Sequence, residues 1–334
     1  MSGKDHPVYR LLLQGISMTD HDEKGAVMRV FAVLSVFAAI AFLLFVSVPA
    51  KALMVQQSDD ATRKLWDTAF INQAKTRRAV RTKPGLQRYR VATPGVPIAN
   101  VAPDTVIGVT LWRLRRAGAA EGGERLIVHE GADTSQWLPE RISAQTKLAQ
   151  GDRLRISVEA ARKGYLYVID REQYADGTLG EPYLIFPTTR TQNGDNQVSI
   201  GKLTEIPAQE DNPPYFTVRR SRADHVAEVL SVLVTPAPLA KIEITDKAQK
   251  LDEAQVAAWE KSWSTGVGWL EMEKAGQAWT REERQAVNNT TRSLLANSPS
   301  PQMVYYRPSA KTSEPLFVKL HLWYKSASKR NTKP

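Results

Sequence analysis

Apolar and polar residues alternate over short runs through most of the chain after residue 103. Around Ile156 the alternation is strict, since Leu154, Ile156 and Val158 fall on one face and polar residues on the other, as in a half-buried β-strand. Turn residues such as Asp176-Gly177 separate the runs. The pattern predicts strands at residues 106–114, 125–129, 153–159, 165–169, 183–186, 197–200, 202–206, 215–219, 228–235, 303–306 and 316–324.

A helical pattern interrupts the strands between residues 251 and 297. Asp252 is placed to cap one helix, and Thr280 with Glu283 forms a capping box for a second. Because the chain returns to β at residues 302–324, these helices are expected to form an insertion. Many short strands with turns between them predict an all-β fold with helical additions, an antiparallel β-sandwich of immunoglobulin-like or jelly-roll-like type.

An apolar segment of 19 residues, Val30 to Val48, lies near the N-terminus and contains no charge. Its length suits a long signal-peptide core or a short membrane-anchor helix. Ala50 and Ala52 form the A-x-A pattern that signal peptidase reads, and we favour cleavage after Ala52 over an anchor. An ordinary core helix fits less well, because the segment has no polar face. A start close to the apolar core would give the most compact signal, and the candidate start residues are Met1, Met18 and Met28.

The chain is therefore expected to act outside the cytoplasm. It would be periplasmic, at the cell surface, or held on the inner membrane by residues 30–48. The predicted parts are an N-terminal extension with the signal or anchor (1–52), a basic helix and Pro-rich linker (53–103), a sandwich domain (104–324, with the helical insertion at 251–297 and closing strands at 302–324) and a basic tail (325–334).

The formal net charge of +10 is concentrated at the two ends of the exported part. Residues 53–90 hold nine Lys and Arg against three Asp, and residues 325–334 hold four basic and no acidic residues. Residues 91–324 hold 27 basic and 28 acidic residues. These basic flanks suit solvated arms, or contact with anionic lipid or envelope polymers. Nucleic acid is the least expected partner, because export would separate the chain from it.

Cysteine is absent from the chain. This absence excludes disulfides, thiolate catalysis, cysteine zinc sites and the lipid-modified cysteine of bacterial lipoproteins. A domain without disulfides must be stabilised by its core, and about 280 residues are enough to bury most of the unfolded surface.

The segment 148–238 carries a resemblance to a known family. Its elements are the strand Gly164-Tyr165-Leu166-Tyr167-Val168, the strand end Leu184-Ile185-Phe186-Pro187 and the turn Ile206-Pro207. The segment resembles the bacterial family called domain of unknown function 4384. The resemblance implies an all-β accessory domain, found in bacteria alone in exported proteins or beside protein-kinase and caspase-like peptidase domains. It implies no activity and no catalytic residue. The family-motif residues Gly164, Tyr165, Tyr167, Phe186 and Pro187 are therefore expected to be structural.

Four acidic residues crowd the segment 170–181, namely Asp170, Glu172, Asp176 and Glu181. Carboxylate oxygens suit calcium, and paired carboxylates suit acid-base hydrolysis. The spacing matches no EF-hand loop, and turn geometry accounts for Asp176-Gly177, so a structural role is the leading interpretation. The weak calcium candidates are Asp170, Asp176 and Glu181.

Other candidate chemistry is sparse. Histidines 129, 225 and 321 lie far apart and form no metal-binding pair, and no nucleophile-elbow, phosphate-loop or dinucleotide motif is present. We therefore expect no cofactor and no catalytic residue. Sugar stacking is an alternative to core packing for four tryptophans, and core packing is favoured: Trp259, Trp263, Trp269 and Trp279.

The sequence as a whole favours a noncatalytic binding or interaction module of the bacterial cell envelope, with an envelope protein or glycan as partner. Two alternatives stay open. One is a structural surface protein held by its basic flanking arms. The other is an unrecognised hydrolase that uses the acidic loop 170–181.

Overall fold

The structure is a computed structural model, and it describes residues 89–93, 95–98, 101–118, 121–130, 133–273, 275–286, 300–308, 310–311 and 313–326. These residues belong to the second of two units, 54–334, into which the chain divides. The predicted signal or anchor segment with Ala50 and Ala52, most of the predicted basic helix and linker, and the basic tail from residue 327 lie outside the described residues. In the described part of the chain, no helix has the length and apolar character needed to cross a membrane.

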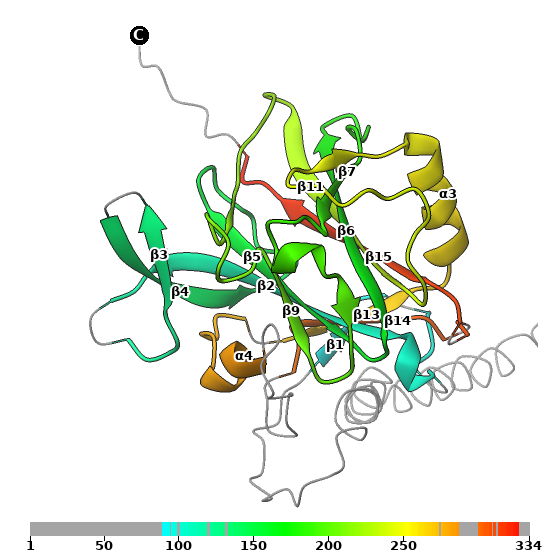
Figure 1. Cartoon of the computed structure of the whole chain (residues 1–334), viewed down its shortest axis with the longest axis horizontal. Helices are drawn as coiled ribbons and strands as arrows, with labels where there is room; N and C mark the ends of the chain where they lie inside the picture. The colour runs from blue at the N-terminus through cyan, green and yellow to red at the C-terminus, as the bar shows by residue number, and fades with distance from the viewer. Residues whose placement is uncertain are drawn as a thin grey trace, which may run out of the picture. The chain divides into compact units, whose positions relative to one another are not determined.

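Strands are the main regular elements of the described part of the chain, and the fold is therefore mainly β (Figure 1). The strands are β1 (Tyr89–Val91), β2 (Val106–Arg116), β3 (Leu126–Glu130), β4 (Asp133–Ile142), β5 (Arg153–Ala160), β6 (Gly164–Tyr174), β7 (Tyr183–Phe186), β8 (Gln197–Val198), β9 (Leu203–Ile206), β10 (Phe216–Thr217), β11 (His225–Thr235), β12 (Gln249–Lys250), β13 (Gly268–Met272), β14 (Met303–Tyr306) and β15 (Leu316–Trp323). The helices are η3 (Pro103–Thr105), η4 (Gln192–Gly194), α3 (Glu253–Trp263) and α4 (Arg281–Ala286).

Nine of the described strands form one antiparallel sheet, with β2 at its centre. One edge of β2 pairs first with β14 and then with β4, while its other edge pairs with β5. β13 and β1 continue the sheet beyond β14, and β3 continues it beyond β4. β9 and β10 pair with the free edge of β5. The long strand β2 thus connects two strand groups on one side with the β5 group on the other.

Six described strands form a second antiparallel sheet in the order β12, β7, β6, β11 and β15, with β8 paired to β6. β6 and β11 pair over most of their length, so that Asp170 lies opposite Leu230 and Glu172 lies opposite Glu228. α3 packs on one face of this sheet, where Val256 joins a buried cluster with Tyr167 and other residues. This cover explains why residues 165–169 are apolar on both faces, as the sequence predicts for a central strand.

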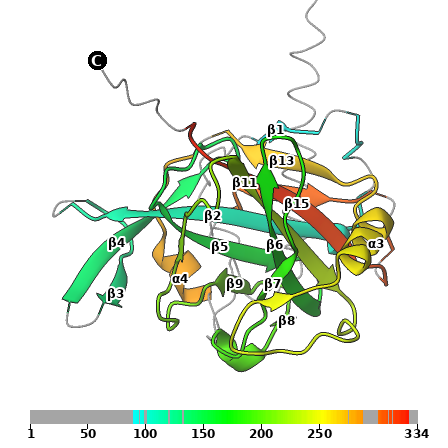
Figure 2. The same ribbon diagram turned by 90° about the horizontal axis from the view of Figure 1, so that it is seen from above.

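The main core lies between the two sheets (Figure 2). It joins Val109 and Ile156 of the nine-stranded sheet to Val168, Val232 and Val318 of the six-stranded sheet. Residues on one face of β5 and β15 enter this core, as the alternation in both segments predicts. Full burial of each such side chain contributes about 1.5–3 kcal/mol to stability.

The prediction of a half-buried β5 is wrong, because the polar face of this strand is also covered. Arg155, Ser157 and Glu159 are each no more than 2% exposed. Trp279, which precedes α4, packs over this face with its ring 6.5 Å from that of Trp112, and Trp112 Nε1 donates a 2.7 Å hydrogen bond to Ser157 Oγ. A strand pattern cannot reveal a cover supplied by residues more than a hundred positions away.

The predicted capping residues of both helices are confirmed. Asp252 Oδ1 accepts a 2.7 Å hydrogen bond from the backbone of Gln255 at the start of α3. At α4 the Glu283 N–H donates to Thr280 Oγ1 at 3.2 Å, and the Thr280 N–H donates back to Glu283 Oε2 at 3.0 Å. The other oxygen of Glu283 forms a buried ion pair with Arg141 of β4. This ion pair attaches α4 to the nine-stranded sheet.

The segment between these helices is not purely helical, because it also contains β13. β13 runs between β1 and β14 of the nine-stranded sheet. Its first residue, Gly268, reads in the sequence as a helix breaker, yet a Cβ at this position would lie 2.6 Å from the Tyr306 ring. The glycine is thus required by a close approach within the sheet.

Two further strands differ from the predictions. β1 occupies part of the segment predicted as an extended linker, and it pairs with β13. β4 was not predicted, because Pro139 and a polar first half obscure its pattern. It nevertheless pairs with β2 and β3, and Pro139 lies opposite Leu114. Nonlocal pairing has outweighed weak local signals at both strands.

Candidate binding pocket

A cavity of about 170 Å³ lies between the two sheets, beside the main core. Exposed Thr217 and partly buried Ile185 and Phe216 border it on the outside. Most of its lining is apolar, and the polar groups in the lining are Asp170, Glu228, Thr217 and Tyr324. The apolar lining residues are Leu111, Leu148, Leu154, Ile156, Ile185, Phe216, Val218, Leu230 and Leu322.

Strand register places the two carboxyl groups in this cavity. Val168 and Val232 on paired strands face the main core. Since side chains at alternate positions share a face, Asp170 follows Val168 on the same face, and Glu228 lies on the corresponding face of β11. Both carboxyl groups therefore stand where the apolar layer between the sheets ends.

Asp170 and Glu228 behave as a pair. Burial, together with the charges of Glu228 and Glu172, raises the pKa of Asp170 well above its usual range. Burial also raises the pKa of Glu228, although a hydrogen bond from Tyr324 opposes that shift. Asp170 Oδ1 and Glu228 Oε2 are buried and accept no hydrogen bond from other described groups. A hydrogen bond between the two carboxyl groups raises the pKa of Asp170 and acts to lower that of Glu228, so in its protonated form Asp170 donates to Glu228.

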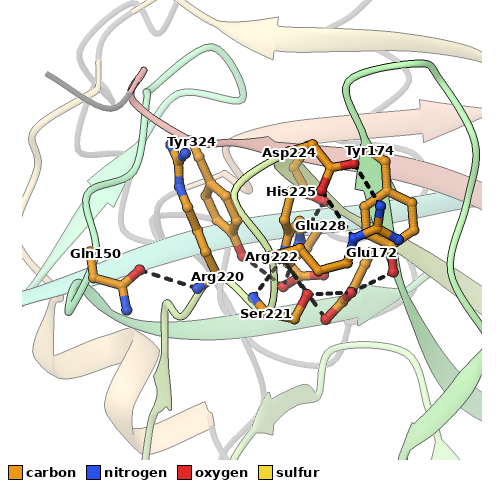
Figure 3. Close-up of polar contacts among 11 residues, drawn as sticks. Gln150, Glu172, Tyr174, Arg220, Ser221, Arg222, Asp224, His225, Glu228 and Tyr324 are labelled. Carbon is orange, nitrogen blue, oxygen red and sulfur yellow. Dashed lines mark hydrogen bonds and ion pairs between the residues drawn. The ribbon is translucent and has the colours of Figure 1, made fainter. Parts of the chain in front are cut away.

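Further polar side chains lie around Glu228 and extend its hydrogen-bond network (Figure 3). Tyr324 Oη donates to Glu228 Oε1 at 2.6 Å, and His225 Nε2 lies 3.4 Å from the same oxygen. The Ser221 N–H donates to His225 Nδ1 at 3.3 Å, while Nε2 donates to the Ala227 carbonyl at 3.0 Å. One ring nitrogen thus accepts and the other donates, which is the pattern of a neutral imidazole.

Glu172 is the second carboxylate of this group. Its Oε2 accepts hydrogen bonds from Ser221 Oγ at 2.6 Å and from Tyr174 Oη at 2.8 Å. Burial acts to raise its pKa, but these two hydrogen bonds and the nearby His225 lower the pKa overall. Glu172 is therefore an ionised carboxylate with its own donors.

Ser221, His225 and Glu172 are the residue types of a nucleophilic triad, but their arrangement differs from one. In a triad the serine contacts one ring nitrogen and the acid contacts the other. Here Ser221 Oγ (3.4 Å) and Glu172 Oε1 (3.8 Å) both lie on the Nδ1 side, and Ser221 Oγ has its short hydrogen bond with Glu172. The group is arranged to orient side chains beside the pocket.

The acidic residues predicted from the sequence have different surroundings. Asp170 lines the cavity, and Glu172 lies in the polar group behind it. Asp176 Oδ1 accepts from the backbone and hydroxyl of Thr178 in an exposed turn. Glu181 pairs with Lys250 at 2.9 Å. Among the described residues no three His, Asp or Glu side chains are placed to hold a metal ion, so the calcium candidates Asp170, Asp176 and Glu181 do not form a shared site.

The family-motif residues have packing positions outside the pocket lining. Gly164 begins β6, where a Cβ would lie 2.4 Å from the Thr235 carbonyl oxygen. Tyr167 packs under α3, and its Oη accepts from the Leu239 N–H at 2.9 Å. Phe186 is fully buried in the main core and is followed by Pro187. Tyr165 packs at the edge of the cluster under α3.

The four tryptophans of the sugar-stacking alternative also have packing partners. Trp259 and Trp263 stack on each other, with ring centroids 5.9 Å apart, against the cluster under α3. Trp269 stacks on Tyr305 at 5.7 Å, and Trp279 is 1% exposed. These contacts favour the packing interpretation.

Sequence reasoning missed Glu228, Tyr324 and His225 as neighbours of Asp170. The alternation in residues 316–324 and 228–235 did predict the strands that carry the first two. The sequence did not show that β11 pairs with both β6 and β15. This pairing brings residues up to 154 positions apart to one end of the core.

Comparisons of the chain with models of known families, with curated proteins and with solved structures found no match. The resemblance of residues 148–238 to the family called domain of unknown function 4384 therefore stays a prediction.

Proposed function

We propose that this protein is a noncatalytic binding module of the bacterial cell envelope, and that the cavity between its sheets is the binding site. The observation that carries the proposal is the Asp170–Glu228 pair in an otherwise apolar cavity. Burying such groups lowers the stability of the fold unless they gain partners, and perturbed carboxyl groups in clefts are typical of functional sites. A ligand with matching polar groups would supply those partners.

The two sheets and their shared core support a further detail of the proposal. We infer a sandwich of immunoglobulin-like or jelly-roll-like type, with the segment around α3 and α4 as an insertion. In such architectures a rigid core presents loops and short strands to ligands. β10 has this role here, since Phe216 and Thr217 border the cavity and pair only with the end of β5 among the described strands.

The binding proposal is tested by closing the cavity from outside. Thr217→Trp places a large ring at the exposed border, and Lys163→Trp is the matched control in an exposed turn away from the cavity. The probe is n-butanol, whose binding to the purified full chain is followed by backbone amide NMR shifts. We expect shifts at Leu230 and Phe216 in the natural chain and in Lys163→Trp, and their loss in Thr217→Trp. Equal shifts in both variants would contradict a site in this cavity.

Export is tested on the protein itself. The intact mass of the protein from fractionated native cells would show either a soluble species beginning at Leu53 or a full-length species that resists carbonate extraction. The first supports cleavage after Ala52 and a free envelope protein. The second supports an anchor at residues 30–48 on the inner membrane. A full-length cytosolic species would contradict the envelope assignment.

A hydrolase is the second candidate function, and the Asp170–Glu228 pair is a better candidate for its acid and base than the exposed part of the acidic loop 170–181. One protonated and one ionised carboxyl group provide an acid and a base side by side. Hydrolysis of envelope substrates that is lost in Asp170→Asn and kept in Asp176→Ala would support this alternative.

The structural alternative depends on the basic flanks. It predicts that deleting residues 327–334 releases the protein from envelope fractions and leaves cavity binding unchanged.

A further inference from the structure

We propose that the cavity binds a primary ammonium group carried on a short aliphatic chain, as in a lysine side chain or a free alkylamine. The inference rests on the binding function proposed above. It adds the chemical class of the ligand, which neither the fold nor the comparisons assign.

The size and lining of the cavity indicate that the ligand has a short aliphatic chain. Its volume is about 170 Å³, and an engineered apolar cavity of about 150 Å³ binds benzene. A chain of four methylene groups is of comparable size. Leu111, Leu154, Leu230 and Leu322 line the cavity, so burying such a chain against them is favourable.

The carboxyl pair sets the charge of the ligand. Asp170 and Glu228 place two carboxyl groups in the lining of the cavity, and Asp170 Oδ1 and Glu228 Oε2 are buried acceptors without other donors among the described residues. An ammonium group has three donors and no acceptor, so it would satisfy both oxygens and neutralise the pair. A carboxylate ligand would be repelled, and a neutral alcohol would leave the charge uncompensated.

The charged side chains around the cavity are already engaged. Arg220 donates to the Lys325 carbonyl and lies over the Tyr324 ring, and Arg222 pairs with Asp224 at 2.7 Å. The two ring nitrogens of His225 are engaged by the Ser221 N–H and the Ala227 carbonyl. Glu172 adds a second negative charge nearby. The surroundings therefore leave the negative charge of the pair available to a cationic ligand.

The test compares three probes with the same four-carbon chain on the purified full chain at neutral pH. They are n-butylammonium, n-butanol and butyrate, and binding is measured by calorimetry and by NMR shifts at Leu230 and Phe216. We expect n-butylammonium to bind about tenfold or more tighter than n-butanol, since hydrogen bonds to charged groups contribute about 1.5–3 kcal/mol. Butyrate is expected not to bind.

The double variant Asp170→Asn with Glu228→Gln keeps the shapes of both side chains and removes both ionisable groups of the pair. We expect this variant to lose the preference for n-butylammonium while still binding n-butanol, which shows that its cavity is intact. Asp170→Asn alone leaves the Glu228 carboxylate in place and should keep the preference for n-butylammonium, so it tests the role of the charge should the double variant fail to fold. Glu181→Gln, in an exposed ion pair with Lys250, is the control and should keep the preference.

The outcomes separate the inference from the function on which it rests. If n-butanol binds as tightly as n-butylammonium, the ammonium inference is overturned and the binding pocket stands. If no probe shifts the cavity residues, both are overturned. A blocked lysine, Nα-acetyllysine methylamide, distinguishes the two ligand sources. If the blocked lysine binds, the natural ligand is a lysine of a partner protein. If n-butylammonium binds and the blocked lysine does not, the natural ligand is a free amine.

Discussion

Tyr324, directly after β15, donates a 2.6 Å hydrogen bond to Oε1 of Glu228 on β11. The bond fixes the carboxyl group that faces the cavity, and it joins the residue after β15 to the neighbouring strand β11. Burial and this hydrogen bond raise the pKa of Tyr324, so the hydroxyl remains a donor at all ordinary pH values.

Replacing this donor should destabilise the fold. Tyr324→Phe leaves Oε1 of Glu228 without its closest donor, and hydrogen bonds to charged groups contribute about 1.5–3 kcal/mol. We expect a loss of that size in the free energy of unfolding, measured by urea denaturation at pH 7. Tyr183→Phe, at a side chain that is 42% exposed, should change little. Equal stability of both variants would refute the role of this hydrogen bond.

Glu159 makes the stability of the fold depend on pH. Burial raises its pKa to about 8, opposed by Arg141. The unfolded chain releases this proton near pH 4.5, whereas the folded chain keeps it up to about pH 8. The contribution of Glu159 is therefore largest below pH 4.5 and is lost as pH rises toward 8.

Glu159→Gln replaces the buried acid by a neutral side chain of similar shape. We expect the variant to be more stable than the natural chain at pH 9, by on the order of a few kcal/mol, and the difference to shrink as pH falls below 5. Urea unfolding across this pH range measures it. A difference that is the same at all pH values would mean that Glu159 ionises normally in the folded protein.

The attachment of α4 depends on Glu283. Glu283→Ala leaves Arg141 buried without its carboxylate, which costs about 3–5 kcal/mol for a buried pair. Arg284→Ala on the same helix removes only the exposed pair with Glu124 and should cost less than about 1 kcal/mol. Thermal unfolding of the two variants measures the contrast, and similar melting temperatures would contradict it.

Gly164 is required by the close pairing of β6 with β11. Gly164→Ala places a methyl group 2.4 Å from the Thr235 carbonyl oxygen, so the strands must separate or shift. We expect a loss of about 1–3 kcal/mol. Gly122→Ala, at a position with no atom within 4 Å of the added Cβ, is the control. Chemical denaturation of both variants tests the difference, and no loss in Gly164→Ala would show that the backbone adjusts freely.

Much of the strand pattern could be predicted from the sequence, because one face of each strand enters a shared apolar core. Leu154, Ile156 and Val158 show this directly. The burial of Arg155 on the other face could not, since Trp279 covers it from a distant part of the chain. Local periodicity reports one face of a strand and carries no information on what covers the other.

For a similar reason, the sequence identifies only part of the candidate site. Asp170 stands out in the sequence as an acid after an apolar strand, but its neighbours in the sequence, Asp176 and Glu181, are not its neighbours in space. Its partners Glu228 and Tyr324 come from β11 and from the residue after β15. Strand register decides which carboxyl groups meet, and the local pattern of residues along the chain does not reveal which strands pair.

The most direct test of the binding pocket is a crystal structure of the protein with n-butylammonium. We predict the alkyl chain among Leu154, Leu230 and Leu322, with the nitrogen within hydrogen-bond distance of Asp170 Oδ1 and Glu228 Oε2. A cavity filled by rearranged side chains, with the ligand elsewhere or absent, would contradict it.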